Sequence, residues 1–189
     1  MAGNVFAPAA LGLLLSAVVG TSPARAQAGP APVTDSGFVQ MAASGGLAEV
    51  QLGKLAQQKA TSAEVKQFGQ RMVTDHTKAN KDLAAAAQKA GITPPTARLP
   101  KHQQTADRLG KQSGAEFDKA YMETMVEDHM ETVGLFMKEA ESGQAPELKQ
   151  LAKQSLPVLE EHLARARKIA GGLGVDTTTA GTAHAEHGK

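Results

Sequence analysis

The pentapeptide Met-Val-x-Asp-His occurs twice in the sequence, at residues 72–76 and 125–129. A weaker version at residues 158–162 again places an acidic residue directly before a histidine. Imidazole is a ligand that zinc, copper, nickel and iron all accept in proteins. Because histidines carried by separate helices can meet inside a bundle, the repeat raises the hypothesis that these three histidines form a metal site.

Helical spacing places each of these histidines on an apolar stripe. His76 follows Met72 by four residues, and His129 follows Met125 by four residues, so each pair shares one face of its helix. His162 has apolar residues at the same kind of spacing. All three side chains are therefore predicted to point into a helical core.

Glu49 is the inward-facing carboxylate of the first helical segment. Buried polar groups without partners are costly, so one such group on each of four helices suggests a shared purpose. The sequence predicts one divalent transition metal (Zn, Cu, Ni or Fe) with four ligands, Glu49, His76, His129 and His162. Counted from the connecting turns, the ligands within a hairpin differ in height by roughly 6–8 Å, about one helical turn. A buried hydrogen-bonded layer without metal is the alternative interpretation.

The acidic residue before each histidine is turned about 100° away from it around the helix. Asp75, Asp128 and Glu161 are therefore predicted to lie at helix interfaces and to support the histidines by hydrogen bonds. A solvated helix face is the equal alternative for these acids. A di-iron site needs a glutamate three residues before a histidine. Such a site is disfavoured because those positions hold Val73, Val126 and Leu159.

Four long helical segments carry these residues, predicted at residues 35–59, 62–90, 115–141 and 146–170. The linker between the second and third segments is predicted to hold a short helix at 101–109. Short turns make two antiparallel hairpins, and burial of their apolar stripes gives an all-α four-helix bundle over residues 35–170. The linker could cap one end of the bundle or cross its length, so an up-down-up-down and a crossover topology both stay open.

Residues 1–26 have the pattern of a secretory signal peptide. Residues 9–20 are apolar, and residues 24–26 form a small-x-small cleavage pattern directly before Gln27. The apolar run is too short for a comfortable membrane span, and no second such stretch follows. The sequence therefore predicts an exported, periplasmic protein without a transmembrane span in its mature chain.

The two segments that flank the bundle are predicted to lack a fixed structure. Residues 27–34 are predicted to be a flexible N-terminal segment, and residues 171–189, rich in Gly, Thr and Ala, a disordered tail. Because the tail has no apolar stripe, deletion of everything after Gly174 is expected to leave the stability of the bundle nearly unchanged.

The composition excludes several classes of function. There is no cysteine, so disulfides, thiolate metal sites and a catalytic thiol are excluded. The formal net charge is +1 and no block of basic residues occurs, so nucleic-acid binding is not expected. No nucleophile–base pair or phosphate-binding glycine loop is visible, so an enzyme is the least favoured class.

Several segments together carry a resemblance to a known family: residues 38–43, 48–53, 72–76, 114–121 and 156–163, together with His129. In these segments the sequence resembles the exported bacterial family named domain of unknown function 4142. The resemblance covers about residues 37–169 and implies a ferritin-like bundle and an exported location, but no activity. Members of this family are often labelled outer membrane proteins, so a peripheral position at that membrane is left open beside a periplasmic one.

Two functions from different classes fit these observations. The first is a metal-binding periplasmic bundle that serves in metal buffering or stress protection. The second is a structural or interaction protein without metal, whose histidines form a buried hydrogen-bonded layer. The sequence names no protein partner for either function.

The signal-peptide pattern predicts the N-terminus of the mature protein. Mass spectrometry of the protein purified from its native host should find the first residue at or near Gln27, because the small-x-small pattern ends at Ala26. Recovery of chains that still begin with Met1 from a cytoplasmic fraction would contradict export.

Overall fold

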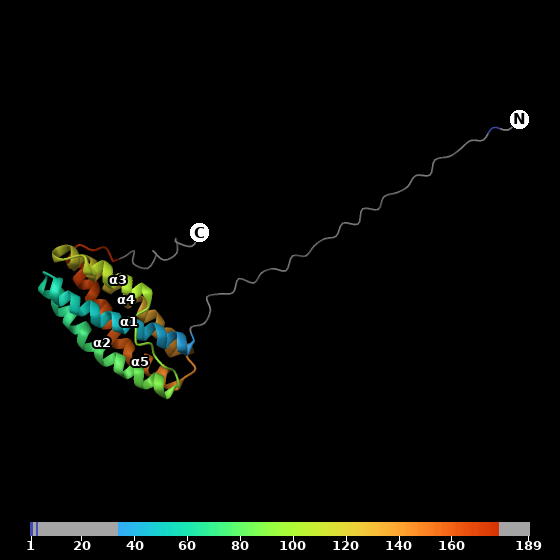
Figure 1. Cartoon of the computed structure of the whole chain (residues 1–189), viewed down its shortest axis with the longest axis horizontal. Coiled ribbons are helices and arrows are strands. Elements are labelled where there is room, and N and C mark those ends of the chain that lie inside the picture. The colour runs from blue at the N-terminus through green and yellow to red at the C-terminus, as the bar shows by residue number, and fades with distance from the viewer. Residues whose placement is uncertain (2, 4–33, 178–189) are drawn as a thin grey trace. The chain divides into compact units, whose positions relative to one another are not determined.

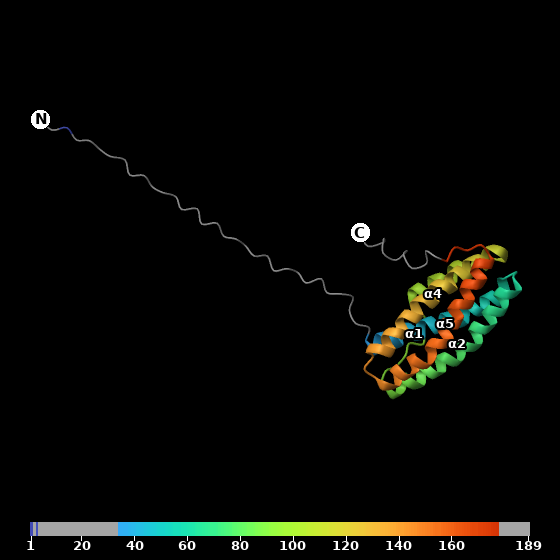
Figure 2. The same ribbon diagram turned by 180° about the vertical axis from the view of Figure 1, so that it is seen from behind.

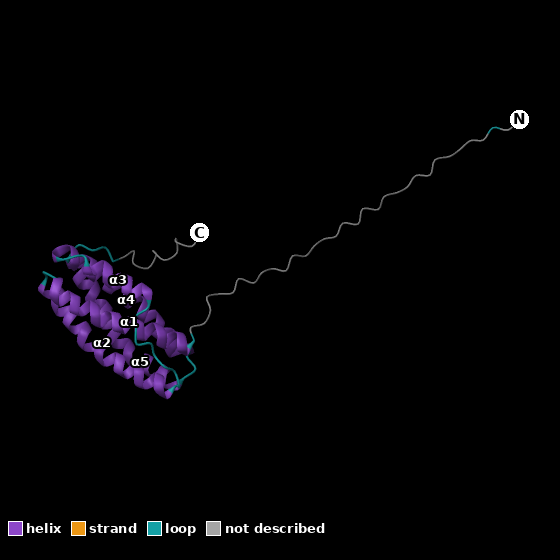
Figure 3. Cartoon of the chain, viewed as in Figure 1, coloured by secondary structure: helices purple, strands orange, loops and turns teal. Residues whose placement is uncertain are grey.

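The computed structural model describes residues 1, 3 and 34–177. The predicted signal peptide and nearly all of the segment at 27–34 lie outside the described residues, as does the tail beyond residue 177. Five helices and no strand occur in the part that is described (Figures 1 and 3). They are α1 (Asp35–Lys59), α2 (Ala63–Lys89), α3 (Pro100–Gly110), α4 (Gly114–Ser142) and α5 (Pro146–Gly172). The all-α prediction is confirmed.

Side-chain hydroxyls cap the N-termini of the two helices in the first hairpin. Thr34 caps α1, because its hydroxyl accepts a hydrogen bond from the Gly37 amide at 3.1 Å. Asp35 and Ser36, which follow this cap, lie within the helix. Ser62 caps α2 as its position suggests.

The four long helices pack in a ring in which α1 lies beside α2 and α4, and α5 lies beside α4 and α2 (Figure 2). The ring of Phe38, near the start of α1, packs on the ring of Phe136, near the end of α4, with centroids 4.9 Å apart. At the other end, the Thr61 amide donates a hydrogen bond to the Asp118 carboxylate at 3.1 Å. Helices α1 and α4 are therefore antiparallel neighbours.

Helices α2 and α5 are also antiparallel. Arg71 of α2 forms an ion pair with Glu161 of α5, and earlier in α2, Gln67 accepts a hydrogen bond from Arg165, later in α5. Since α1 is antiparallel to both α2 and α4, α2 and α4 run in the same direction. The linker must then cross the length of the bundle. The structure thus has the crossover topology, which the sequence leaves open.

A hydroxyl of α1 holds the linker in place. Ser44 is fully buried, and its Oγ accepts a hydrogen bond from the Leu99 amide at 2.7 Å. The same Oγ forms a hydrogen bond of 2.6 Å with Nδ1 of His102 in α3. Helix α3 lies against α1 and α4 as a result.

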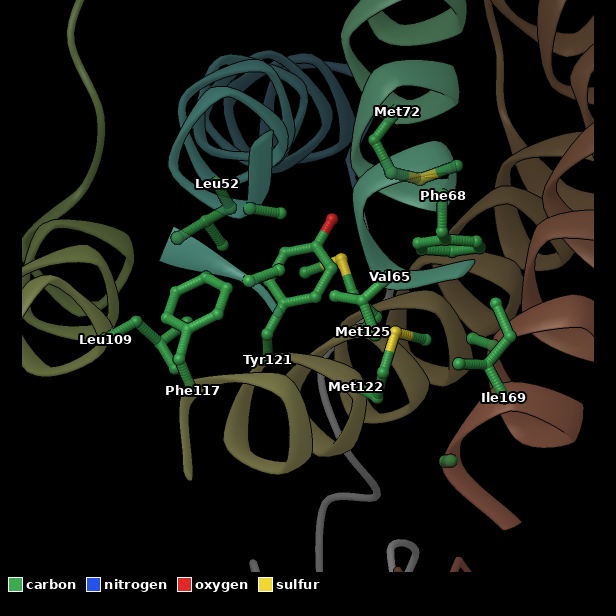
Figure 4. Close-up of a cluster of buried hydrophobic side chains, with 14 of the residues drawn as sticks. Leu52, Val65, Phe68, Met72, Leu109, Phe117, Tyr121, Met122, Met125 and Ile169 are labelled. Carbon is green, nitrogen blue, oxygen red and sulfur yellow. The ribbon is translucent and has the colours of Figure 1, made fainter. Parts of the chain in front are cut away.

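The apolar core is divided into two clusters along the bundle. One cluster is built from residues such as Leu52, Phe68, Tyr121 and Met125 (Figure 4), and the other contains residues such as Phe38. On each long helix, one buried ionisable side chain falls between the segments that contribute to the two clusters. These residues are Glu49, His76, His129 and His162. The difference in height predicted from the connecting turns therefore does not prevent these four residues from lying between the same two clusters.

Helix α5 extends two residues beyond the predicted boundary at 170. Leu173 and Val175 then pack against the cluster that contains Ile169, and the Val175 amide donates a hydrogen bond to the Ala170 carbonyl at 3.0 Å. Two half-buried residues within the segment predicted as the tail therefore pack against the core. Among the described residues, no helix is apolar and long enough to cross a membrane.

These contacts change the expected result of truncation. Removal of the residues after Thr177 should leave the melting temperature unchanged, whereas removal of the residues after Gly172 exposes apolar surface at Ile169 and should cost roughly 1–3 kcal/mol. Thermal melts of the two truncated proteins check this. Truncation after Gly174, expected above to be neutral, should give an intermediate loss because it deletes Val175. Equal melting temperatures for all three proteins would show that the packing of Leu173 and Val175 adds nothing.

Candidate metal centre

Three histidines from three helices meet between the two apolar clusters. One ring nitrogen of His76 (α2), one of His129 (α4) and one of His162 (α5) all lie within 4.8 Å of one another. The exposed fractions of these residues are 7%, 1% and 1%. The structure therefore brings together all three histidines that the sequence selects.

Hydrogen bonds set the tautomers of two of these rings. Nδ1 of His129 lies 2.9 Å from the Met125 carbonyl oxygen and can only donate to it, which leaves the lone pair on Nε2. Nε2 of His162 lies 2.8 Å from Oδ2 of Asp75, which leaves the lone pair on Nδ1. Both remaining nitrogens, and Nε2 of His76, are buried without a hydrogen-bond partner. Buried polar atoms rarely stay unpaired, so three at one place point to a ligand.

All three imidazoles are held in the neutral form. Burial lowers the pKa of His76 well below its usual value, and the nearby His129 and His162 lower it further. Burial, with the charge of His162, lowers the pKa of His129 to about 4. Burial also lowers the pKa of His162, although the hydrogen bond to Asp75 offsets part of this effect. Neutral imidazole is the form that binds metal ions.

Asp75 supports a histidine on the neighbouring helix rather than the one next to it in sequence. Its carboxylate accepts hydrogen bonds from His162 and, at 3.1 Å, from Nε of Arg71. Burial tends to raise the pKa of Asp75, but these two hydrogen bonds outweigh burial and lower it. Arg71 also contacts Glu161 at 2.7 Å, so hydrogen bonds link Glu161 to His162 through Arg71 and Asp75. Sequence reasoning misses Arg71, although its place four residues before Asp75 is a detectable signal.

Glu49 approaches the site from a different side. Its Oε1 lies 3.7 Å from Nδ1 of His129, which is beyond hydrogen-bond distance, and this is the nitrogen that donates to Met125. The carboxylate lies outside the group of three ring nitrogens, and its Oε2 has no hydrogen-bond partner. Burial, with the charge of Asp128, raises the pKa of Glu49 well above its usual value. Glu49 as a metal ligand stays a prediction.

Asp128 lies close enough to Glu49 for their charges to interact. Burial, with the charge of Glu131, raises the pKa of Asp128 to about 6. The repeated pentapeptide therefore gives its two aspartates different surroundings. Asp75 forms hydrogen bonds with a histidine and an arginine, whereas Asp128 interacts with the charges of nearby carboxylates and of Lys101 and Arg108.

A cavity of about 870 Å³ adjoins the three-histidine group. Two of the three histidines line it, as does Glu49, and all four long helices and α3 contribute to its wall. The lining near the histidines comes from polar and apolar residues such as Glu49, Asp75, His76, Asp128, Leu159 and His162. The cavity gives small ions and molecules a space next to the unpaired nitrogens.

Comparisons with known proteins agree with the fold. The family model described as "Domain of unknown function (DUF4142)" matches residues 20–169, so the chain belongs to this family, as the resemblance indicates. No curated protein matches the sequence. A solved structure titled "CopM in the Cu(II)-bound form" matches with a TM-score of 0.62 and 18% sequence identity. The match covers 74% of this chain and 97% of the other, and at this identity it concerns the fold alone.

Replacement of Glu49 by glutamine tests the electrostatics of the site in protein freed of metal. The pKa of the Glu49 carboxyl is raised in the folded state, so the proton that it binds stabilises the folded wild type at low pH. This contribution to stability is lost as the pH rises through the folded-state pKa. At about pH 4, Glu49→Gln should therefore melt at nearly the same temperature as the wild type. As the pH rises toward about 8, the melting temperature of Glu49→Gln should increasingly exceed that of the wild type. The matched control is Glu123→Gln, at an exposed position of α4. A difference between Glu49→Gln and wild type that does not change with pH would contradict this assignment.

Proposed function

We propose that this member of the DUF4142 family binds one divalent transition-metal ion through His76, His129 and His162. The observation that carries the proposal is the set of three buried ring nitrogens, close together and without hydrogen-bond partners. A metal ion would satisfy all three lone pairs at once. Nε2 of His129 and Nδ1 of His162 are both acceptors in the neutral rings, so neither nitrogen can satisfy the other.

The donor set favours copper and zinc among the candidate ions. Imidazole suits Zn, Cu, Fe and Ni, and affinity for divalent ions is generally greatest at copper. The fold is similar to that of a protein whose structure is titled as Cu(II)-bound, which makes Cu(II) the first ion to test. A di-iron centre is not proposed, since the group is made of three imidazoles without a bridging carboxylate.

The hydrogen-bond partners of the histidines fit a metal site. Metal-bound histidines commonly donate their other ring N–H to a carboxylate or a backbone carbonyl, which orients the ring. His162 has the Asp75 carboxylate in this position, and His129 has the Met125 carbonyl. We assign Glu49 the role of fourth ligand, reached by rotation of its side chain, since its present position faces Nδ1 of His129.

The proposed role is metal buffering or stress protection in the periplasm, without catalysis. Export is part of the proposal and rests on the signal-peptide pattern in residues 1–26. The second candidate is a structural layer without metal. Its support is that two of the three histidines already form hydrogen bonds within the protein. A layer without metal leaves the three buried nitrogens that lack hydrogen-bond partners without an explanation.

Metal binding should stabilise the folded protein. Cu(II), Zn(II) or Ni(II) should raise the melting temperature of metal-free protein, and a chelator should reverse the effect, because an ion at 100 times its dissociation constant adds about 2.7 kcal/mol. His129→Ala should abolish the response. His187→Ala, in the segment that the sequence predicts to be a tail, should retain it. Identical melting curves with metal and with chelator would remove the metal hypothesis and leave the structural layer.

The pH below which metal no longer raises the melting temperature distinguishes buried ligands from surface histidines. Ordinary histidines take up protons near pH 6.5, so surface binding should fade below about pH 6. Burial lowers the pKa of His129 to about 4, so the response of the proposed site should persist below pH 6 and disappear as the pH approaches that value. Metal titrations monitored by thermal melting between neutral pH and pH 4 measure the end point. Loss of the response already above pH 6 would place the bound metal elsewhere.

A further inference from the structure

The cavity beside the three histidines has the size of a small-molecule site. Its volume of about 870 Å³ lies within the range of about 300–1,000 Å³ that is typical of ligand pockets. Apolar side chains from all four long helices form part of its wall: Met41, Leu83, Leu135 and Leu159. Such a wall suits the apolar body of a ligand.

Unpaired buried atoms of the lining residues identify where a polar group of the ligand would lie. Nε2 of His76, Nδ1 of His162 and Oε2 of Glu49 are all buried and without hydrogen-bond partners. All three residues line the cavity. His129 does not line it, so the cavity reaches the histidine group from the side of α2 and α5.

The side-chain charges along the cavity offer little attraction to an anionic ligand. The structure places four cationic side chains there, and Arg71, Lys78 and Lys101 each form an ion pair with a carboxylate. The remaining cation is Lys138. Glu49 and Asp128 more than offset its charge when they are ionised. No cluster of cations is left to bind a carboxylate or a phosphate.

From these observations we propose that the cavity binds a small neutral molecule with one nitrogen donor and an apolar body, anchored by the metal. This inference rests on the metal site proposed above. Three protein imidazoles leave a tetrahedral ion one further position, which an external donor can take in place of water or of Glu49. Imidazole derivatives and similar heterocycles belong to this chemical class.

The experiment uses 4-phenylimidazole as the probe and plain imidazole as the comparison. Zn(II) is first titrated into the metal-free full-length protein, which establishes the metal site independently. Calorimetric titration at about pH 8, where free imidazoles are neutral, then measures binding of each probe. The zinc-loaded protein should bind 4-phenylimidazole about tenfold or more tightly than imidazole, because the cavity buries the phenyl group. Protein without zinc should bind it far more weakly.

A matched pair of variants tests whether the cavity is the binding place. A side chain added at Gly134, which lines the cavity, or at Gly110, which does not, would meet no atom within 4 Å at its Cβ. Gly134→Phe should lower the affinity for 4-phenylimidazole about tenfold, and Gly110→Phe should not change it. Both variants should still bind zinc, since neither glycine takes part in the hydrogen bonds that orient His129 and His162.

Each of the other possible results contradicts a specific part of the inference. Equal affinity of 4-phenylimidazole with and without zinc would show that metal does not anchor the ligand. Equal affinity of 4-phenylimidazole and imidazole, or tighter binding of benzoate, would exclude the cavity or the neutral class. Failure of the initial zinc titration would instead overturn the proposed function, and this inference with it.

Discussion

The burial of three neutral imidazoles side by side is the constraint on which the rest of the structure depends. Each ring must lose contact with water, and only two of the six ring nitrogens have hydrogen bonds that fix a tautomer, those of His129 and His162. Such a layer is tolerated only where surrounding packing holds the rings in place. The two apolar clusters on either side provide that packing, and the four helices must be level with one another for the layer to form.

The fold could be predicted as far as local patterns determine it. Spacing of apolar residues gives the helices and the inward face of each histidine, and short turns give the two hairpins. The way the hairpins dock depends on contacts between residues far apart in sequence, such as Thr61 with Asp118 and Ser44 with Leu99. Such long-range contacts accompany the crossover topology, and no periodic pattern in the sequence predicts them.

The site shows the same division between local and tertiary information. Helical phase places Glu49 on the inward face, but it does not determine which nitrogen of His129 the carboxylate approaches. The two copies of the pentapeptide predict equivalent roles for Asp75 and Asp128. The structure gives them different roles, because α2 faces α5 at Asp75 whereas Asp128 lies near Glu49 of α1. Identical local sequence therefore does not imply identical chemistry.

The crossover topology has a consequence for the electric field at the centre of the bundle. Every neighbouring pair among the four long helices is antiparallel, so the backbone dipoles of adjacent helices oppose one another. The histidine layer lies far from the helix ends, where those dipoles act most strongly. The backbone thus contributes little potential there, and side chains such as Asp75, Arg71 and Glu49 set it. Single substitutions among these few residues can retune the centre without any change in the scaffold.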